Sequence, residues 1–473
     1  MNKKINWDSN AIYEGKKESK KIYLKVLSHL RDIINEYNDL NLTIIEYELI
    51  LGLFIERFIG HFYFSWKETL NGYKPKKFNL VPNIETLSEA YDVGVQNKWH
   101  EHLRYVVSML LSNNLILESV LIEHKKKYSN NFLASFDNLV KILKLTAKNY
   151  FFNSKTPVLL HLPRLACGKI ETISNLTRWK KFAYLGNLHN ITLVIPSKDW
   201  EWRFKKVEEY KFEGTFLSLV LHLLPLYLPN EILEGLSTNR EKVLKMNLKR
   251  PKVIFSSGIT NSSIIGILFS EWKKKGTKLV IHQHGGGYEM KSKLAIEDFE
   301  KRNADYFLNW GMPKNKSHHL SLSPSTPKYI WRKKVYKKNI LFVCNDVEEY
   351  PYELEYNPWC EANKTMHREF SIFINNLKDK NNLIIREYFR KSKWNNLSKI
   401  MKKYNNLNID IERNIFKSYS KAKITVHMIP ATTFLETMGC NIPSIIYFDI
   451  SVYKFNKKTL KIFDALEKNG IYY

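Results

Sequence analysis

The residues best suited to chemistry are two histidines and a run of glycines that follow a short apolar stretch. The segment 278–288 reads KLVIHQHGGGY, and its first five residues are typical of a buried strand. His282 and His284 then stand at the carboxyl end of that strand, where α/β enzymes keep their reacting groups. Imidazole is the usual general base near neutral pH and can take a proton from a hydroxyl group. The neighbouring loop residues are Gln283, Gly285, Gly286 and Gly287.

The glycines predict a turn whose backbone N–H groups approach an anion or a sugar closely, because no side chain stands in the way. Two other interpretations stay open. One is a structural turn with a histidine satisfied inside the core. The other is the HGGG oxyanion loop of esterases, but the sequence contains no GxSxG elbow to accompany it.

A second segment, 429–436 (IPATTFLE), joins an apolar strand to a helix. Thr432 or Thr433 is a natural N-cap, so the first helical N–H groups are expected to face a cleft. Such a helix start binds anions and suits a nucleotide phosphate. Glu436, one turn further on, is placed to accept hydrogen bonds from ribose hydroxyls. The alternative is a structural helix whose carboxylate is favoured by the helix dipole.

Two further groups of charged residues are candidates. Arg386 ends an apolar run, and its planar guanidinium can bind a phosphate or carboxylate; a solvated arginine at a strand end is the alternative. Glu297, Asp298 and Glu300 lie in AIEDFEKRNAD, where one carboxylate could act as a base or orient a histidine. A charged, solvated helix face is the alternative for most of them.

Around these segments, apolar runs with strand character alternate with helical spacing, which predicts an α/β fold with parallel sheets. We expect residues 1–150 to be mainly helical and 151–325 to form a Rossmann-like part of the same lobe. Residues 326–473 are expected to form a second lobe, after a Ser/Pro/Lys-rich linker at 321–338. We predict strands at 158–162, 191–195, 253–255, 278–282, 305–309, 339–344, 382–387, 423–428 and 444–448. We predict helices at 23–37, 40–63, 101–117, 262–275, 367–377, 396–404 and 433–440.

The charge of the chain is unusual for its length of 473 residues. Lysine and arginine total 74 against 47 acidic residues, which gives a net charge of +27. This excess indicates an anionic partner: nucleic acid, a lipid headgroup surface or a phosphorylated substrate. The lysines are spread along the chain, and no zinc-finger, RRM or KH signature accompanies them, so nucleic acid is the weaker choice. AT-rich codon usage explains part of the excess.

Cysteine content and apolar runs bear on the compartment. The four cysteines form no CxxC pair and are too few to staple the chain, so we expect reduced, mostly buried thiols. The N-terminus has no secretory signal core. The longest apolar run, 216–228, is shorter than the about 20 residues that span a bilayer. We therefore expect a cytoplasmic protein, with peripheral association at the inner face of the membrane an open alternative.

Several segments together resemble a family of transferases found with bacterial surface-polysaccharide and O-antigen (lipopolysaccharide) biosynthesis genes. Most of the chain is covered by the resemblance, which is specific as a set and not through any single segment. The segments are FEGTFLSLVLHLLPLYLPNEILEG (212–235), PKVIFSSG (251–258), KLVIHQHGGGYEM (278–290), ADYFLNWG (304–311), LIIREY (383–388) and ATTFLETMGCNIPSII (431–446).

The resemblance implies a GT-B-like fold of two Rossmann-like lobes and a nucleotide-activated sugar donor. By position, it places His282, Gln283, His284 and the glycines in the acceptor-lobe loop. Arg386, Thr432, Thr433 and Glu436 take the donor-nucleotide positions. Two departures stand out. Glu289 replaces a small residue, commonly glycine, and the chain ends at 473 where relatives continue with further helices, so we expect a second lobe that ends early.

The predicted function is that of a glycosyltransferase that needs no cofactor or metal and takes a nucleotide sugar as donor. No DxD motif suits a metal diphosphate, and 346–348 and 410–412 are weak substitutes. His284 or His282 would deprotonate a hydroxyl of a glycan or lipid-linked acceptor, with Glu297 orienting the base. The alternatives are a non-catalytic, truncated relative that acts as a complex subunit, and a basic nucleic-acid-binding protein.

Overall fold

A computed structural model gives the fold of the 473-residue chain. The residues that the structure describes are 7–74, 84–94, 97–112, 158–161, 182–185, 194–259, 262–292, 294–311, 319–321, 338–345, 360–387, 401–404 and 407–473. Most of the predicted linker, 321–338, lies outside these residues, and so does most of the predicted helix at 396–404.

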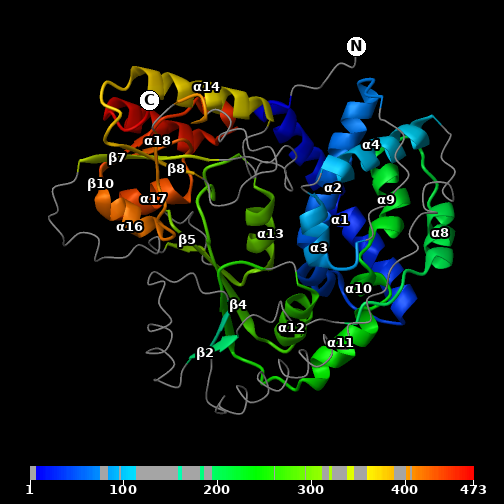
Figure 1. The fold of residues 1–473 in the computed structure, drawn as a ribbon. Coiled ribbons are helices and arrows are strands. Elements are labelled where there is room, and N and C mark those ends of the chain that lie inside the picture. The colour runs from blue at the N-terminus through cyan, green and yellow to red at the C-terminus, as the bar shows by residue number, and fades with distance from the viewer. Residues whose placement is uncertain are drawn as a thin grey trace.

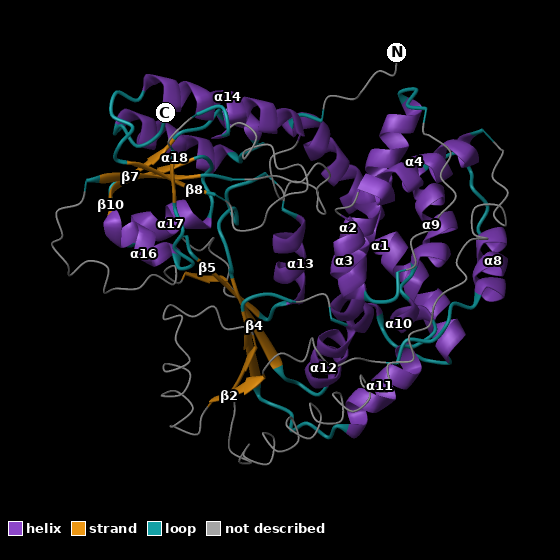
Figure 2. Cartoon of the chain, viewed as in Figure 1, coloured by secondary structure: helices purple, strands orange, loops and turns teal. Residues whose placement is uncertain are grey.

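Two parallel sheets organise the molecule (Figures 1 and 2). The first has the strand order β2-β1-β3-β4-β5-β6 and the second the order β11-β10-β7-β8-β9. Every pairing within the two sheets is parallel, and helices flank both, so the predicted α/β class with two Rossmann-like lobes is confirmed. The first sheet contains β1 (Val158–His161), β2 (Phe182–Leu185), β3 (Val253–Ser256), β4 (Lys278–His282), β5 (Tyr306–Asn309) and β6 (His319–Ser321). The second contains β7 (Asn339–Val343), β8 (Leu383–Arg386), β9 (Asn408–Ile409), β10 (Ala422–His427) and β11 (Ser444–Ile446).

The described part of the N-terminal region, within residues 7–112, is mainly helical and packs directly on the first sheet's helices. Asp8 caps its first helix by accepting from the backbone N–H groups of Asn10 and Ala11. The second helix opens with a capping box between Thr43 and Glu46 and is buried around most of its circumference. The helices described here are α1 (Ser9–Asn38), α2 (Ile44–Leu70), α3 (Leu87–Gly94) and α4 (Asn97–Leu111).

The remaining helices cover the sheets. In the first lobe, α12 packs so closely on α2 that a Cβ on Gly266 would lie 2.7 Å from the Ile50 Cα. In the second lobe, α14 and α18 cover one face of the sheet while α16 and α17 cover the other (Figure 1). First-lobe helices are α8 (Trp200–Glu209), α9 (Phe216–Tyr227), α10 (Asn230–Leu233), α11 (Leu236–Lys245), α12 (Ser263–Lys274) and α13 (Ala295–Asn303). Second-lobe helices are α14 (Cys360–Asn376), α16 (Ile415–Lys421), α17 (Thr432–Gly439) and α18 (Lys457–Lys468), with a 3₁₀ turn at Ile450–Val452.

The long apolar run at 216–228 forms α9, which is largely buried in the first lobe. Among the described residues, no helix has both the length and the apolar character needed to cross a membrane. Cys344 and Cys440, two of the four cysteines, are buried free thiols, in agreement with the expectation from the sequence.

One predicted strand, at 191–195, is wrong in its described part. Val194 and Ile195 have no strand structure. The side-chain amide of Asn239 replaces a strand partner there: the Val194 N–H donates to Asn239 Oδ1 over 3.0 Å, and Asn239 Nδ2 donates to the Val194 carbonyl over 2.9 Å. Strand β2 takes the edge position in the first sheet instead, and the sequence did not predict it.

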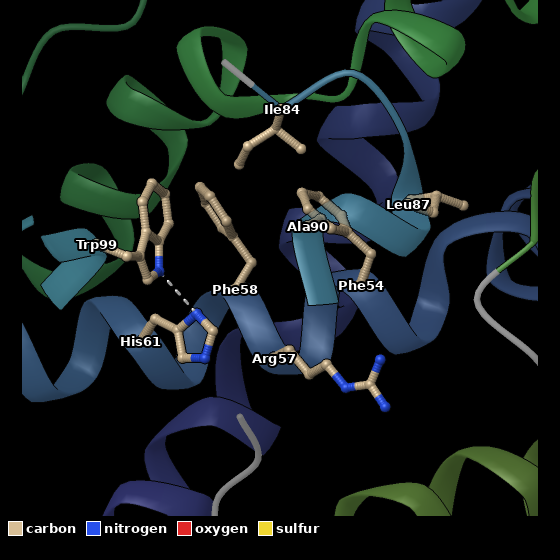
Figure 3. Close-up of a pocket in the computed structure, with 8 residues that line it drawn as sticks. All are labelled: Phe54, Arg57, Phe58, His61, Ile84, Leu87, Ala90 and Trp99. Atoms are coloured by element: carbon tan, nitrogen blue, oxygen red, sulfur yellow. Dashed lines mark hydrogen bonds between the residues drawn. The ribbon is translucent and has the colours of Figure 1, made fainter. Parts of the chain in front are cut away.

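The helical region contains one small cavity of about 20 Å³ (Figure 3). The Trp99 indole N–H donates to His61 Nδ1 at its wall over 3.1 Å, and the Arg57 side chain points away from the other lining residues. A space of this size holds no more than a single water molecule, so the cavity has no room for a substrate. Its lining residues are Phe54, Arg57, Phe58, His61, Ile84, Leu87, Ala90 and Trp99.

Ion pairs that include a buried glutamate connect this helical region to α13. The Lys16 ammonium lies 2.9 Å from the Glu56 carboxylate, and both side chains are almost completely buried. Arg302, near the end of α13, pairs with Glu56 over 3.2 Å and with Glu48 over 2.7 Å. Since α2 supplies both carboxylates, the position of α13 over the first sheet is fixed from the helical side.

We expect the substitution Glu56→Gln to destabilise the first lobe strongly. The change leaves the Lys16 charge buried without a carboxylate, and breaking a buried pair in this way typically costs about 3 kcal/mol or more. Urea unfolding followed by tryptophan fluorescence measures the loss. The control is Glu14→Gln, which removes the exposed partner of Lys17 and is expected to leave the transition in place. Equal transitions for the two variants would contradict the anchoring role.

Candidate active site

The glycine loop of the first lobe and the start of α17 in the second lobe touch each other. The backbone N–H of Gly286 donates to Thr432 Oγ1 over 2.7 Å. A Cβ added to Gly286 would lie 2.5 Å from the Ala431 carbonyl carbon and from the Thr432 nitrogen. This spacing admits only glycine, because the atoms in the way belong to backbone. Two of the segments that the sequence predicts to be functional therefore meet in space.

The segment after the glycine loop is tied to the second lobe as well. Lys291 forms an antiparallel bridge with Phe455, and the Ser292 N–H donates to the Lys454 carbonyl over 2.8 Å. On the other side of the bridge, the Asn456 N–H donates to the Met290 carbonyl over 3.1 Å. These bonds attach the chain on both sides of Lys291, so the loop can neither slide nor swing without breaking several of them.

His284 lies in this loop beside a tyrosine and a buried glutamate. Its Nδ1 is 2.9 Å from the Tyr288 hydroxyl, which donates to Glu300 Oε2 over 2.8 Å. The Nδ1 is also 3.6 Å from Glu300 Oε1. The Glu300 side chain is completely buried, whereas 20% of the His284 side chain is exposed. His284 is thus hydrogen-bonded to Tyr288 on one side, and part of its side chain is exposed to solvent.

The carboxylate beside His284 is that of Glu300 and not of Glu297, the residue that the sequence suggested. Glu297 pairs with Lys301 and accepts the backbone N–H of Glu289 over 3.0 Å. Burial raises the pKa of Glu297, although Lys301 acts in the opposite direction. Glu297 and Glu300 lie almost one turn apart along α13, so only one of the two carboxylates reaches the level of His284.

Glu289 has a left-handed backbone, with φ of 60°. Only glycine adopts that conformation without cost, so the backbone is strained at Glu289. In this chain the Glu289 carboxylate pairs with Lys301. That ion pair offsets part of the backbone strain.

His282 is buried behind the loop, with 1% of its surface exposed. Its Nε2 accepts the indole N–H of Trp310 over 3.1 Å, and burial lowers the pKa of His282 to about 4. The ring is therefore neutral at physiological pH. Gln283 links Trp310 to the glycine loop. Its side-chain amide accepts the Trp310 backbone N–H over 2.9 Å and donates to the Gly285 carbonyl over 2.7 Å.

Helix α17 begins at Thr432, and its N-cap is Ala431, one residue earlier than predicted. Ala431 offers no side-chain cap, and Thr432 Oγ1 accepts from Gly286 instead. Thr433 Oγ1 lies 3.2 Å from His427 Nδ1, and Thr437 Oγ1 lies 3.2 Å from His427 Nε2. Burial lowers the pKa of His427 to about 3, so a neutral imidazole holds the first turn of α17 onto β10.

Arg386 and Glu436 both contact α16 beside this helix. Arg386 Nη1 donates to Ser418 Oγ over 3.1 Å and to the Glu412 carbonyl over 2.9 Å, and it forms an ion pair with Asp410. The Tyr419 hydroxyl lies 3.3 Å from Glu436 Oε2. Asp410 and Ser418 also border a cavity of about 150 Å³. The predicted donor residues are thus linked through α16, with Arg386 committed to contacts inside its own lobe.

The sequence profile of the LIC12162 family transferase matches residues 3–473. The chain belongs to this transferase family. No curated protein matches it. Among solved structures, MurG from Acinetobacter baumannii is 11% identical over 66% of this chain and 84% of its own, with a TM-score of 0.33. A Listeria monocytogenes protein titled "putative UDP-N-acetylglucosamine 2-epimerase" is 10% identical over 67% of this chain and 88% of its own, with a TM-score of 0.36.

In this LIC12162 family member, sequence reasoning missed several residues that complete the site. Tyr288 stood in the glycine-loop segment without a role, and Trp310 stood in the segment ADYFLNWG. His427 lies next to the end of the predicted strand 423–428, which is a signal that could have found it. Gly258 follows β3 with φ of 128°, and a Cβ there would lie 3.1 Å from Glu300 Oε1.

The described residues can be examined for side chains that could bind a metal ion. Among the described residues, no group of three or more His, Cys, Asp and Glu side chains is arranged to hold a metal ion. One of the weak candidates, 346–348, lies outside the described residues. In the other, Asp410 accepts from Ser418 and Glu412 pairs with Lys421. Metal-free transfer stays a prediction.

We expect Gly286→Ala to push the two lobes apart. The added methyl group would meet two backbone atoms at 2.5 Å, so the loop or α17 must move. Small-angle X-ray scattering is expected to show a larger radius of gyration. Gly311→Ala is the matched control, because a Cβ there has no neighbour within 4 Å. Superimposable scattering curves for Gly286→Ala and the wild type would contradict a rigid contact between the lobes.

Proposed function

We propose that this transferase is a glycosyltransferase of GT-B type, which moves a sugar from a nucleotide-activated donor to a hydroxyl of a surface-polysaccharide or O-antigen acceptor. The observation that carries the proposal is the contact between Gly286 and Thr432. It brings the histidine loop of one parallel sheet to the helix start of the other. Ligands of such sheets bind beyond the carboxyl ends of the strands, which is where both segments lie.

In the proposed reaction, His284 takes the proton of the acceptor hydroxyl as the oxygen attacks the anomeric carbon of the donor sugar. The bond between that carbon and the phosphate oxygen breaks, and the nucleotide leaves with its negative charge. The N-terminal N–H groups of α17, near Thr432 and Thr433, stabilise this charge, as helix starts do for phosphates. Glu436 is assigned to the ribose of the nucleotide. No step requires a metal ion.

The close contact between Gly286 and α17 has a consequence for donor binding. The glycine backbone lies directly against Ala431 and Thr432, so a diphosphate cannot occupy the same position. We therefore propose that the donor enters when the lobes separate. The backbone bonds of Met290 and Ser292 to residues of the second lobe follow soon after Gly286 in the chain, and an opening motion would have to break them.

The net charge of +27 favours binding to anionic substrates and surfaces. A phosphorylated donor and an acceptor at an anionic lipid surface both attract a basic protein, and each lysine near such a surface adds about 1 kcal/mol. We propose that the enzyme acts at the inner face of a membrane on a lipid-linked or glycan acceptor. Binding to anionic vesicles, with none to neutral vesicles, would support this placement.

Replacement of His284 tests the proposed base directly. We expect His284→Ala to lower the rate of sugar transfer by about 10²- to 10⁴-fold, the usual contribution of a general base. The rate is measured with UDP-, GDP-, dTDP- and CMP-sugars and a lipid-linked acceptor. Thermal stabilisation by the donor should persist in the variant, because His284 is not assigned to donor binding.

The control is His367→Ala on α14, the helix that covers the far face of the second sheet, and it should retain full activity. Undiminished transfer by His284→Ala would remove the assigned base. If no nucleotide sugar stabilises the wild-type protein, the result would favour a non-catalytic subunit. Salt-sensitive DNA binding without any response to nucleotide sugars would favour a nucleic-acid partner.

A further inference from the structure

The hydrogen bonds around His284 have a defined direction. A phenol has one hydrogen to donate, and the Tyr288 hydroxyl lies 2.8 Å from Glu300 Oε2 and 2.9 Å from His284 Nδ1. An ionised carboxylate only accepts, so the phenol hydrogen points to Glu300. Toward His284 the phenol oxygen can then only accept. The hydrogen between those two atoms must therefore belong to Nδ1.

We infer that Tyr288 and Glu300 are positioning residues that hold His284 in its Nδ1–H tautomer and so make Nε2 the basic nitrogen. The inference rests on the proposed function in assigning a base role to His284, but the tautomer itself does not depend on it. In the transfer step, the acceptor O–H bond breaks and an Nε2–H bond forms. The Nδ1 proton stays in place, and Glu300 continues to accept from Tyr288.

Glu300 has a second effect through its charge. Its Oε1 lies 3.6 Å from His284 Nδ1, too far for a hydrogen bond but close enough for electrostatic attraction. Among the described residues, this buried oxygen has no hydrogen-bond partner. Once Nε2 has taken a proton, the imidazolium lies beside a carboxylate in a buried setting. The carboxylate therefore stabilises the charged form that the reaction produces.

The fold holds the group of three firmly. The Tyr288 ring stacks on Phe307 of β5, with centroids 6.0 Å apart and planes at 23°. Arg302 anchors α13, and hence Glu300, to the carboxylates of α2. Gly258 lies next to both residues, because a Cβ on it would be 3.1 Å from Glu300 Oε1 and 3.5 Å from His284 Nδ1. Because glycine has no side chain, position 258 leaves room for the imidazole of His284 and the carboxylate of Glu300.

A simpler view is that Glu300 only accepts the hydrogen bond of the buried Tyr288 hydroxyl and has no effect on His284. The two views differ in what happens to His284 when the phenol is removed. In Tyr288→Phe, Nδ1 loses the phenol oxygen as an acceptor, and Glu300 Oε1 at 3.6 Å does not replace it at the observed geometry. The positioning role predicts a mixture of His284 tautomers in this variant, whereas the simpler view predicts no change in tautomer.

The test is nitrogen-15 NMR of the full-length protein labelled at histidine, with the His284 signals identified by their absence in His284→Gln. In the wild type we expect Nδ1 to be protonated and Nε2 to be of the pyridine type. In Tyr288→Phe and Glu300→Gln we expect both tautomers, and a fall in kcat of at least 10-fold with little change in KM. Tyr73→Phe is the matched control, because it removes a tyrosine–carboxylate bond to Glu101 in the helical region.

Each outcome is decisive. An Nε2–H tautomer in the wild type would overturn the inference, and so would an unchanged tautomer in both Tyr288→Phe and Glu300→Gln. If Tyr288→Phe does not fold, Glu300→Gln provides the same comparison with a side chain of equal shape. If the tautomers behave as expected but no sugar donor is used, the positioning role stands and the proposed function fails.

Discussion

The rest of the site depends on one constraint, which is the close approach of the Gly286 backbone to the start of α17. A hydrogen bond of 2.7 Å joins Gly286 to Thr432, and no side chain fits between the two segments. Gly285 and Gly286 follow from this packing, because a Cβ at either position would press against Thr432 or Ala431. Gly287 has a different reason, a left-handed backbone with φ of 100°. The same contact sets the distance between the histidine loop and the predicted donor residues, which lie in different sheets.

The helical region contributes to the site through its charges. The buried pair of Lys16 and Glu56 continues to the partly exposed Arg302, which links α1 through α2 to α13, and α13 carries the carboxylate behind His284. Buried ion pairs of this kind are weak sources of stability compared with apolar packing, but they specify one arrangement when either partner alone would be costly. The charge pattern therefore fixes the orientation of α13, while the apolar core supplies the stability.

Much of this architecture could be predicted from the sequence. Apolar runs bounded by turn residues placed β4 correctly to the residue and β3, β5 and β10 within one, because buried parallel strands are nearly uniform in composition. The strand at 191–195 failed because the amide of Asn239 satisfies the backbone there, and no pattern within the segment reveals a partner 45 residues away. Sequence reasoning likewise chose Glu297 over Glu300, since three residues on one charged helix look alike until the helix is docked.

Burial decides which histidine can exchange protons at this edge of the molecule. His282 and His427 are both nearly inaccessible, and desolvation lowers the pKa of each, to about 4 and about 3 respectively. They stay neutral and serve as fixed hydrogen-bonding groups for Trp310 and for α17. His284 differs in two ways that matter together: part of its ring is exposed, and a buried carboxylate lies beside it. In the proposed reaction, this exposure gives the acceptor access to the imidazole, and the carboxylate favours the charge that follows from taking a proton. The same residue type thus supplies structure at two strand ends and, in the proposed function, the base in the glycine loop.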